Sequence, residues 1–123
     1  PEVVRGGFFC SYNSLTSLEG APEVVHGDFY CYNNNLISLK GAPKEVHGDF
    51  VCNHNNLTTV KGAPEVVHGD FNCENNPNPH PKLEWETRKE NPDLSEDEIN
   101  MIMFEKTEDT IYLSKEVQEI FIF

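Results

Sequence analysis

Hydrophobic and polar residues alternate with a period of two in a seven-residue segment, residues 25–31, that recurs along the chain. Its odd-numbered positions carry Val, Gly, Phe and Cys, and its even-numbered positions carry His, Asp and Tyr. The segment returns at residues 46–52 and 67–73, and a looser copy stands at residues 4–10, with a step of 21 residues each time. Since successive side chains of a strand point to opposite faces, each copy is predicted to be a short strand with one buried face.

Strands that recur at a fixed spacing are expected to stack in register as a parallel sheet, with about 4.8 Å between neighbours. Their inward residues then form ladders through the interior. The two predicted ladders are Phe8, Phe29, Phe50 and Phe71, and Cys10, Cys31, Cys52 and Cys73. Gly27 also falls on the inward face, either because a side chain would collide with the Phe layer or because the backbone takes a positive φ angle.

An Asn stands three residues after each Cys, where the chain must leave the strand and turn. These residues are Asn13, Asn34, Asn55 and Asn76. An inward Asn side chain bonds the backbone groups that a turn leaves unpaired, so an Asn ladder is predicted. A Gly-Ala-Pro triplet at residues 20–22, 41–43 and 62–64 makes the second corner, because Pro fixes φ and donates no hydrogen bond.

The run F-x-C-x-x-N-x-L-x-x-L resembles the core of leucine-rich repeats, L-x-x-L-x-L-x-x-N/C-x-L. The variant with Gly-Ala-Pro and His-Gly-Asp-Phe is similar to short repeats of bacterial and bacteriophage proteins, and the resemblance covers residues 1–76. The chain departs from the family pattern at the pattern's first Leu, because the apolar residue of this chain, Val, stands one place earlier. The resemblance implies a mostly β repeat solenoid of about four leucine-rich-repeat-like parallel coils. The back of each coil is short and contains Gly and Pro, so extended or 3₁₀ structure is expected there.

The repeat stops after Asn76, and the rest of the chain has a different composition. Residues 77–81 alternate Pro with Asn and His and are predicted to form a Pro-rich connector. Residues 82–123 are predicted to be a C-terminal capping segment, because a solenoid needs a cover over its last coil. The alternative is a segment that binds a partner or another copy of the chain.

The clearest helix signal lies in this last segment. Ser95 and Glu98 are spaced as a capping box, which predicts a helix over about residues 95–106. The other expected elements are a short helix at 82–91, a short strand at 111–113, and a helix or strand at 114–123. Together they make the cap a small α-helical one.

Charge and composition exclude several classes of partner. A net charge of −12 over 123 residues argues against direct binding to nucleic acids or anionic membranes, because both require a basic surface. No apolar run approaches the roughly 20 residues of a membrane span, and no signal peptide is visible. Because the chain begins at Pro1 inside a repeat, we expect it to derive from a longer protein. The expected compartment is the cytoplasm of a bacterium or of a phage-infected host cell, with a virion as the alternative.

The four Cys residues lack the C-x-x-C spacing of metal sites. Adjacent copies come close enough for a disulfide by distance alone. Parallel side chains give that bond poor geometry, however, so buried free thiols and a reducing compartment are predicted.

His and Asp stand two residues apart on the outward face in three copies. The pairs are His26 with Asp28, His47 with Asp49, and His68 with Asp70. One interpretation is a divalent metal site or a surface that changes charge near neutral pH. The interpretation favoured here is that His beside Asp relieves repulsion within the Asp column, because a flat sheet makes ligands diverge. No metal or cofactor is therefore predicted.

The same outward face is the customary ligand surface of leucine-rich repeat proteins, so the resemblance makes it a candidate partner-binding surface. Phe9 and Tyr30 are the best anchors, because aromatic residues dominate interface energetics. The full candidate set is Arg5, Phe9, His26, Asp28, Tyr30, His47, Asp49, His68 and Asp70.

No nucleophile elbow, phosphate-binding Gly-rich loop or H-E-x-x-H motif is present. The predicted function is a non-enzymatic module that binds a protein partner through the strand face, the C-terminal segment or both. The alternatives are an acidic inhibitor that mimics a nucleic acid, a structural component of a phage particle or other larger assembly, a homo-oligomer, and a hydrolase that uses the His and Asp residues.

Overall fold

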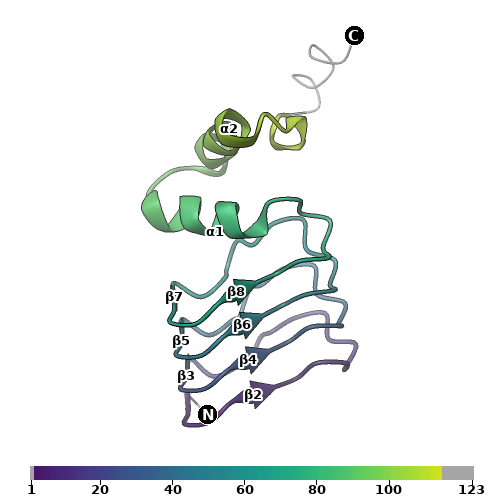
Figure 1. Cartoon of the computed structure of the whole chain (residues 1–123), viewed down its shortest axis with the longest axis vertical. Coiled ribbons are helices and arrows are strands. Elements are labelled where there is room, and N and C mark those ends of the chain that lie inside the picture. Colours follow the sequence, from purple (N-terminus) through teal and green to yellow (C-terminus); the bar gives the residue numbers. More distant parts are fainter. Residues whose placement is uncertain (1, 115–123) are drawn as a thin grey trace. The chain divides into compact units, whose positions relative to one another are not determined.

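A computed structural model describes residues 2–114 as a parallel β-solenoid followed by helices (Figure 1). Each 21-residue copy contributes one two-residue strand to each of two four-stranded sheets. The first sheet contains β1 (Val3–Val4), β3 (Val24–Val25), β5 (Glu45–Val46) and β7 (Val66–Val67). The second contains β2 (Phe8–Phe9), β4 (Phe29–Tyr30), β6 (Phe50–Val51) and β8 (Phe71–Asn72). The predicted repeat solenoid is confirmed, with three turns of chain joining the four copies.

The strands pair in register, one repeat apart, as predicted. Phe8 is paired with Phe29, Phe29 with Phe50, and Phe50 with Phe71. Their rings stack nearly parallel, with centroids 5.2, 5.3 and 5.6 Å apart. Phe29 and Phe50 have no exposed surface, so the Phe ladder is the centre of the core.

The single predicted strand over residues 25–31 is wrong in one respect, because a bend at residues 26–27 divides it into β3 and β4. The bend depends on glycine for space. A Cβ on Gly27 would lie 2.7 Å from the Gly7 nitrogen and 2.9 Å from the Gly6 carbonyl carbon. The collision is therefore with the backbone of the preceding coil and not with the Phe layer. Positive φ angles of 91–92° occur instead at the corner glycines Gly20, Gly41 and Gly62.

The Asn ladder is confirmed in the inner coils. The Oδ1 atom of Asn34 accepts hydrogen bonds from the backbone N–H groups of Asn13 (2.9 Å) and Leu15 (3.0 Å). Its Nδ2 group donates to the carbonyls of Cys10 and Cys31, both at 3.0 Å. Each inner Asn side chain therefore joins its own turn to the turn of the coil before it.

The helix α1 (Pro81–Glu90) begins in the solenoid, and the chain divides into two compact units within this helix, after Trp85. The Pro-rich segment 77–81 belongs to the first unit, since the Asn78 N–H donates to the Leu57 carbonyl at 2.9 Å. In the same unit, the indole of Trp85 stacks on Phe71. Residues 81–85 thus cover the last coil, and a capping role for the rest of the segment 82–123 stays a prediction.

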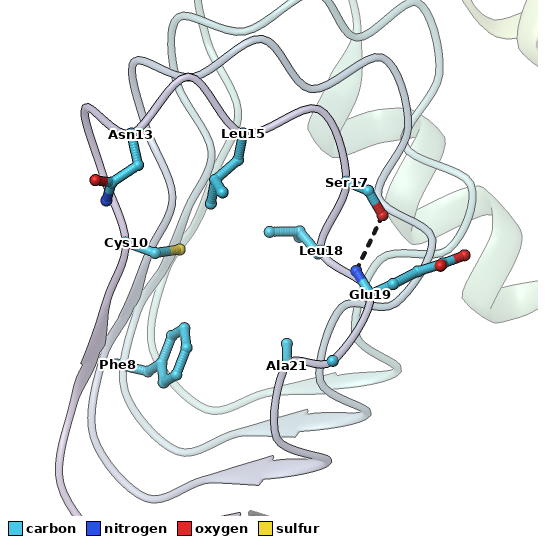
Figure 2. A pocket seen from close by; sticks show the side chains of 9 residues that line it. Phe8, Cys10, Asn13, Leu15, Ser17, Leu18, Glu19 and Ala21 are labelled. Atoms are coloured by element: carbon cyan, nitrogen blue, oxygen red, sulfur yellow. Dashed lines mark hydrogen bonds between the residues drawn. The ribbon is translucent and has the colours of Figure 1, made fainter.

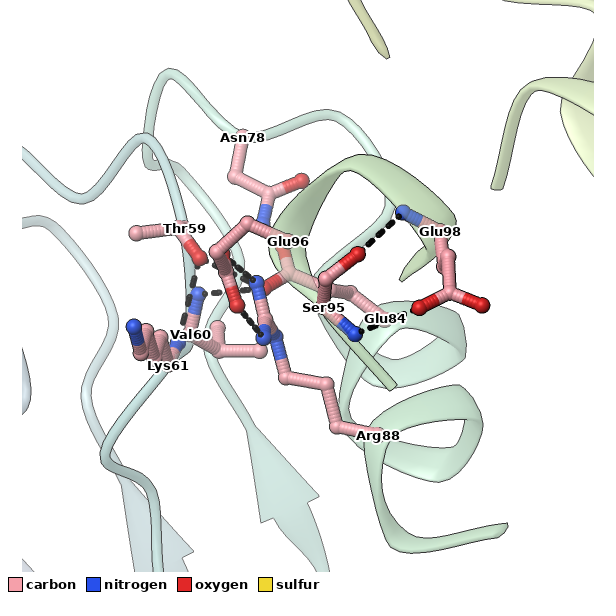
Figure 3. Close-up of polar contacts among 9 residues, drawn as sticks. All are labelled: Thr59, Val60, Lys61, Asn78, Glu84, Arg88, Ser95, Glu96 and Glu98. Carbon is pink, nitrogen blue, oxygen red and sulfur yellow. Dashed lines mark hydrogen bonds and ion pairs between the residues drawn. The ribbon is translucent and has the colours of Figure 1, made fainter. Parts of the chain in front are cut away.

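A buried carboxylate completes this cap. Glu84 is only 3% exposed. It accepts hydrogen bonds from the Thr59 hydroxyl (2.6 Å), the Val60 N–H (3.0 Å) and the Asn78 amide (2.7 Å), as Figure 3 shows. Its role was not predicted, although an acid among the first residues of a helix is common.

The second unit contains the rest of α1, the helix α2 (Glu96–Thr107) and the 3₁₀ helix η1 (Thr110–Tyr112). The predicted capping box is confirmed: Ser95 Oγ accepts from the Glu98 N–H, and Glu98 Oε1 accepts from the Ser95 N–H. The strand expected at 111–113 is wrong, since Ile111 and Tyr112 belong to η1, which is capped by Asp109, and Leu113 is the C-cap. The element expected at 114–123 lies almost wholly outside the described residues. Over residues 2–114, neither helix is long and apolar enough to cross a membrane.

Candidate functional site

The outward face of the second sheet is formed by the second residue of each strand. Phe9, Tyr30, Val51 and Asn72 form one column, because β2, β4, β6 and β8 pair in register. The inward neighbours are the Phe ladder. The column therefore has a fixed spacing, while its side chains differ from coil to coil.

Four aromatic side chains gather at the start of this column and are called the aromatic cluster. They are Phe9, Tyr12, Tyr30 and Tyr32. Ring centroids lie 5.1 Å apart for Phe9 and Tyr30, 5.9 Å for Tyr30 and Tyr32, and 5.4 Å for Tyr12 and Tyr32. Phe9 is 66% exposed and Tyr12 73% exposed. The cluster is thus a continuous aromatic surface open to solvent.

Two members of the cluster were missed in the sequence. Tyr12 and Tyr32 occupy different positions of the repeat, so a column-by-column comparison separates them. Tyr12 has a left-handed backbone (φ 60°), and its N–H donates to the Tyr32 carbonyl at 3.2 Å. This local turn brings the two rings together.

Tyr30 is oriented by a neighbouring carboxylate. Its hydroxyl donates to Asp28 Oδ2 at 3.2 Å. This hydrogen bond, and then the negative charge of Asp28, raises the pKa of the Tyr30 phenol above its ordinary value. The phenol is accordingly a neutral hydrogen-bond donor at physiological pH.

The Asp residues of the repeat bond the backbone of the next coil. Asp28 Oδ1 accepts from the Asp49 N–H at 2.7 Å, and Asp49 Oδ1 accepts from the Asp70 N–H at 2.8 Å. Asp28 and Asp49 are half-buried, whereas Asp70 is exposed. The expected pairing of His with Asp is replaced by this Asp ladder, whose role is structural.

The His residues form a separate stack. Ring centroids lie 4.6 Å apart for His26 and His47, and 4.7 Å apart for His47 and His68. Glu45 Oε1 lies 2.9 Å from His47 Nε2 and 3.5 Å from His68 Nε2. All three side chains are partly exposed. A carboxylate that sequence reasoning did not single out therefore joins two of the predicted site residues.

Glu45 stands where the third copy of the repeat departs from its neighbours. It pairs in register with Val24 on one side and Val66 on the other. The signal in the sequence is the change from Pro-Glu-Val-Val in the second and fourth copies to Pro-Lys-Glu-Val in the third. Arg5, the first-copy equivalent of the His column, is exposed in the bend between β1 and β2.

The prediction of free thiols is confirmed for Cys10 and Cys31. The sulfur atoms of Cys52 and Cys73 lie in direct contact, and Cys10 and Cys31 are free. The Cα atoms of Cys52 and Cys73 are 4.7 Å apart because their coils stack in register, and the free thiols expected at these two positions stay a prediction. Burial raises the pKa of both the Cys10 and Cys31 thiols, and the neighbouring Cys10 raises that of Cys31 further. Both free thiols are therefore protonated and poorly nucleophilic.

The first coil leaves an apolar hollow of about 280 Å³ (Figure 2). Its apolar lining includes Phe8, Cys10, Leu15, Leu18 and Ala21. Most of these positions are buried against a neighbour in the following coils. The apolar part of the hollow thus has the composition of a coil-stacking surface.

Comparison of the chain with protein-family models, with curated proteins and with solved structures finds no match.

Proposed function

We propose that this protein is a non-enzymatic binding module whose protein partner docks on the outward face of the second sheet. The observation that carries the proposal is the aromatic cluster, in which Phe9 and Tyr12 are mostly exposed and held in contact with two further rings. Contiguous exposed apolar surface is typical of interaction sites, and aromatic side chains contribute a large share of interface energy.

The scaffold supports such a role because it holds the rings in place. Tyr30 lies on β4, whose neighbours pair with it on both sides, and its hydroxyl is fixed by Asp28. Side chains that are ordered before binding lose less conformational entropy when a partner docks. The net charge of −12 favours a partner whose rim is basic.

The resemblance to leucine-rich repeats favours the same face, and it also motivates the proposed location in the cytoplasm of a bacterium or phage-infected cell. The free thiols of Cys10 and Cys31 support a reducing compartment. The proposed location therefore rests on the resemblance and on these thiols.

The proposal is tested by affinity capture from a bacterial lysate with the wild-type chain and a Phe9→Ser/Tyr12→Ser variant. Ile37→Ser is the matched control, since Ile37 is 67% exposed and lies outside the aromatic cluster. A partner identified by mass spectrometry should be lost with the double variant and kept with the control. Equal recovery with all three chains places the interface elsewhere.

Salt dependence separates this function from the acidic-mimic alternative. Binding through the aromatic cluster should persist at 1 M salt, where the Debye length is about 3 Å. Binding that disappears at that salt concentration, with no effect of the double variant, favours an acidic decoy of a nucleic-acid-binding protein.

A further inference from the structure

We propose that Glu45, His47 and His68 bind one divalent cation of the zinc class. The three side chains place one ligand atom each within 4.8 Å of one another. This site is separate from the aromatic cluster, and the inference does not depend on the proposed function.

Two of the three distances between ligand atoms suit a small first-row cation. With Zn–N and Zn–O bonds of about 2.0–2.1 Å in a tetrahedral arrangement, ligand atoms lie about 3.3 Å from one another. Glu45 Oε1 already lies 2.9 Å from His47 Nε2 and 3.5 Å from His68 Nε2. Small rotations of partly exposed side chains complete the coordination.

The backbone holds both imidazoles in position. His47 directly follows β5, and its N–H donates to the Val25 carbonyl at 2.9 Å. His68 directly follows β7, and its N–H donates to the Val46 carbonyl at 3.0 Å. The rings stack with an angle of 28° between their planes, so both Nε2 atoms come within reach of the one carboxylate.

A flat sheet was expected to make metal ligands diverge, but the side chains of Glu45, His47 and His68 converge. The His residues lie in the bends that follow β5 and β7, and their rings stack on one another. The Asp residues lie beyond the bends and bond the backbone of the next coil, so they are not part of the His stack. The carboxylate on β5 then supplies the convergent third ligand. Such convergence is what separates a metal site from a row of polar residues.

The repeat provides an internal comparison for the carboxylate. Val24 and Val66 hold the positions that pair with Glu45. A His stands two residues after this position in all three coils. Packing therefore does not require Glu at this position. The carboxylate adds the one ligand that a His stack lacks.

The ligand set selects the class of ion. Two imidazoles and a carboxylate suit Zn²⁺ and its first-row neighbours, whereas Mg²⁺ and Ca²⁺ prefer sites made of oxygen ligands. Because the side chains are partly exposed, water reaches the remaining coordination positions.

The first experiment is isothermal titration calorimetry of the untagged chain with ZnCl₂ and, in parallel, MgCl₂. One Zn²⁺ should bind per chain, with no comparable heat from Mg²⁺. Glu45→Val and His68→Ala should each weaken Zn²⁺ binding tenfold or more, while His54→Ala should leave it unchanged, because His54 is exposed and lies outside the His stack. Glu45→Val introduces the residue already present at the paired positions, so its circular dichroism spectrum should match the wild type.

The second experiment moves the site by one coil. In a Val24→Glu/Glu45→Val variant the carboxylate pairs with His26 and His47, by equivalence with Glu45, His47 and His68. Zn²⁺ binding should return, and it should now be lost with His26→Ala and kept with His68→Ala. Unchanged Zn²⁺ affinity in Glu45→Val, or equal losses from His54→Ala and His68→Ala in the wild-type background, overturns the proposal.

Discussion

The indole of Trp85 lies parallel to the ring of Phe71, with centroids 4.5 Å apart and 4° between the planes. Trp85 therefore continues the Phe ladder by one further ring, supplied by a helix and not by a coil. Its Nε1–H donates to the Pro64 carbonyl at 2.8 Å, so the polar part of the indole is satisfied as well. The end of the repeat is closed by the same stacking that holds its coils together.

Replacing Trp85 by Ala should destabilise the fold by about 3–5 kcal/mol, because it exposes Phe71 and removes a buried aromatic side chain. Trp85→Phe should lose less, since it keeps the stacked ring. The measurement is equilibrium urea denaturation followed by circular dichroism. Trp fluorescence does not serve here, because Trp85 is the only Trp in the chain and the substitution removes it. A loss below about 1 kcal/mol for Trp85→Ala would contradict a capping role.

The Asn ladder gives a prediction with its own control. Asn55→Ala should cost about 2–4 kcal/mol, because it leaves the carbonyls of Cys31 and Cys52 and the Leu36 N–H without this partner inside the protein. Asn13→Ala should change the free energy of unfolding little, since Asn13 is exposed and its amide donates only within its own turn, to Ser11. Equal losses in the free energy of unfolding for Asn55→Ala and Asn13→Ala would show that the hydrogen bonds of the Asn ladder do not stabilise the fold.

The close approach of neighbouring bends can be tested with two glycines at the same repeat position. A Cβ on Gly48 would lie 2.8 Å from the Gly27 carbonyl carbon, so Gly48→Ala should destabilise by about 1–3 kcal/mol. A Cβ on Gly6 meets nothing within 4 Å, and Gly6→Ala should be neutral or slightly stabilising. Thermal unfolding of both variants measures the contrast, and a neutral Gly48→Ala would disprove the steric requirement.

The Cys ladder predicts a specific thiol count. Chain unfolded in denaturant without reductant should react with four equivalents of a thiol reagent, one for each Cys, and prior reduction should add none. Before unfolding, Cys10 and Cys31 should react slowly with the thiol reagent, because burial raises the pKa of each thiol. Two equivalents without reductant, rising to four after reduction, would show that Cys52 and Cys73 are bonded.

Sequence patterns predicted the core because it depends on identity between copies. Phe29 and Asn34 recur with a fixed spacing, and in-register stacking follows from that recurrence alone. The bend at Gly27 escaped prediction, since alternation is the same for a straight strand and for two strands separated by a bend. The backbone contact that requires the glycine exists only between stacked coils.

The candidate sites were predicted less completely for a related reason. Phe9 and Tyr30 share a column and were found, whereas Tyr12 and Tyr32 meet only through a left-handed turn. Glu45 was visible as a shifted acid in the third copy, but its reach to His68 depends on the path of the backbone between two coils. Relations between unlike repeat positions need the fold before they can be recognised.

The polar ladders have a consequence for how such a chain changes over generations. Asp28 reaches the Asp49 N–H, and Asn34 reaches the Leu15 N–H, so each inner coil is bonded to its neighbour by the same contacts. A genetic duplication or deletion of one whole repeat therefore restores every one of these contacts at the new junction. The outward column can lengthen, shorten or exchange a side chain such as Tyr30, Val51 or Asn72 while the interior is inherited intact.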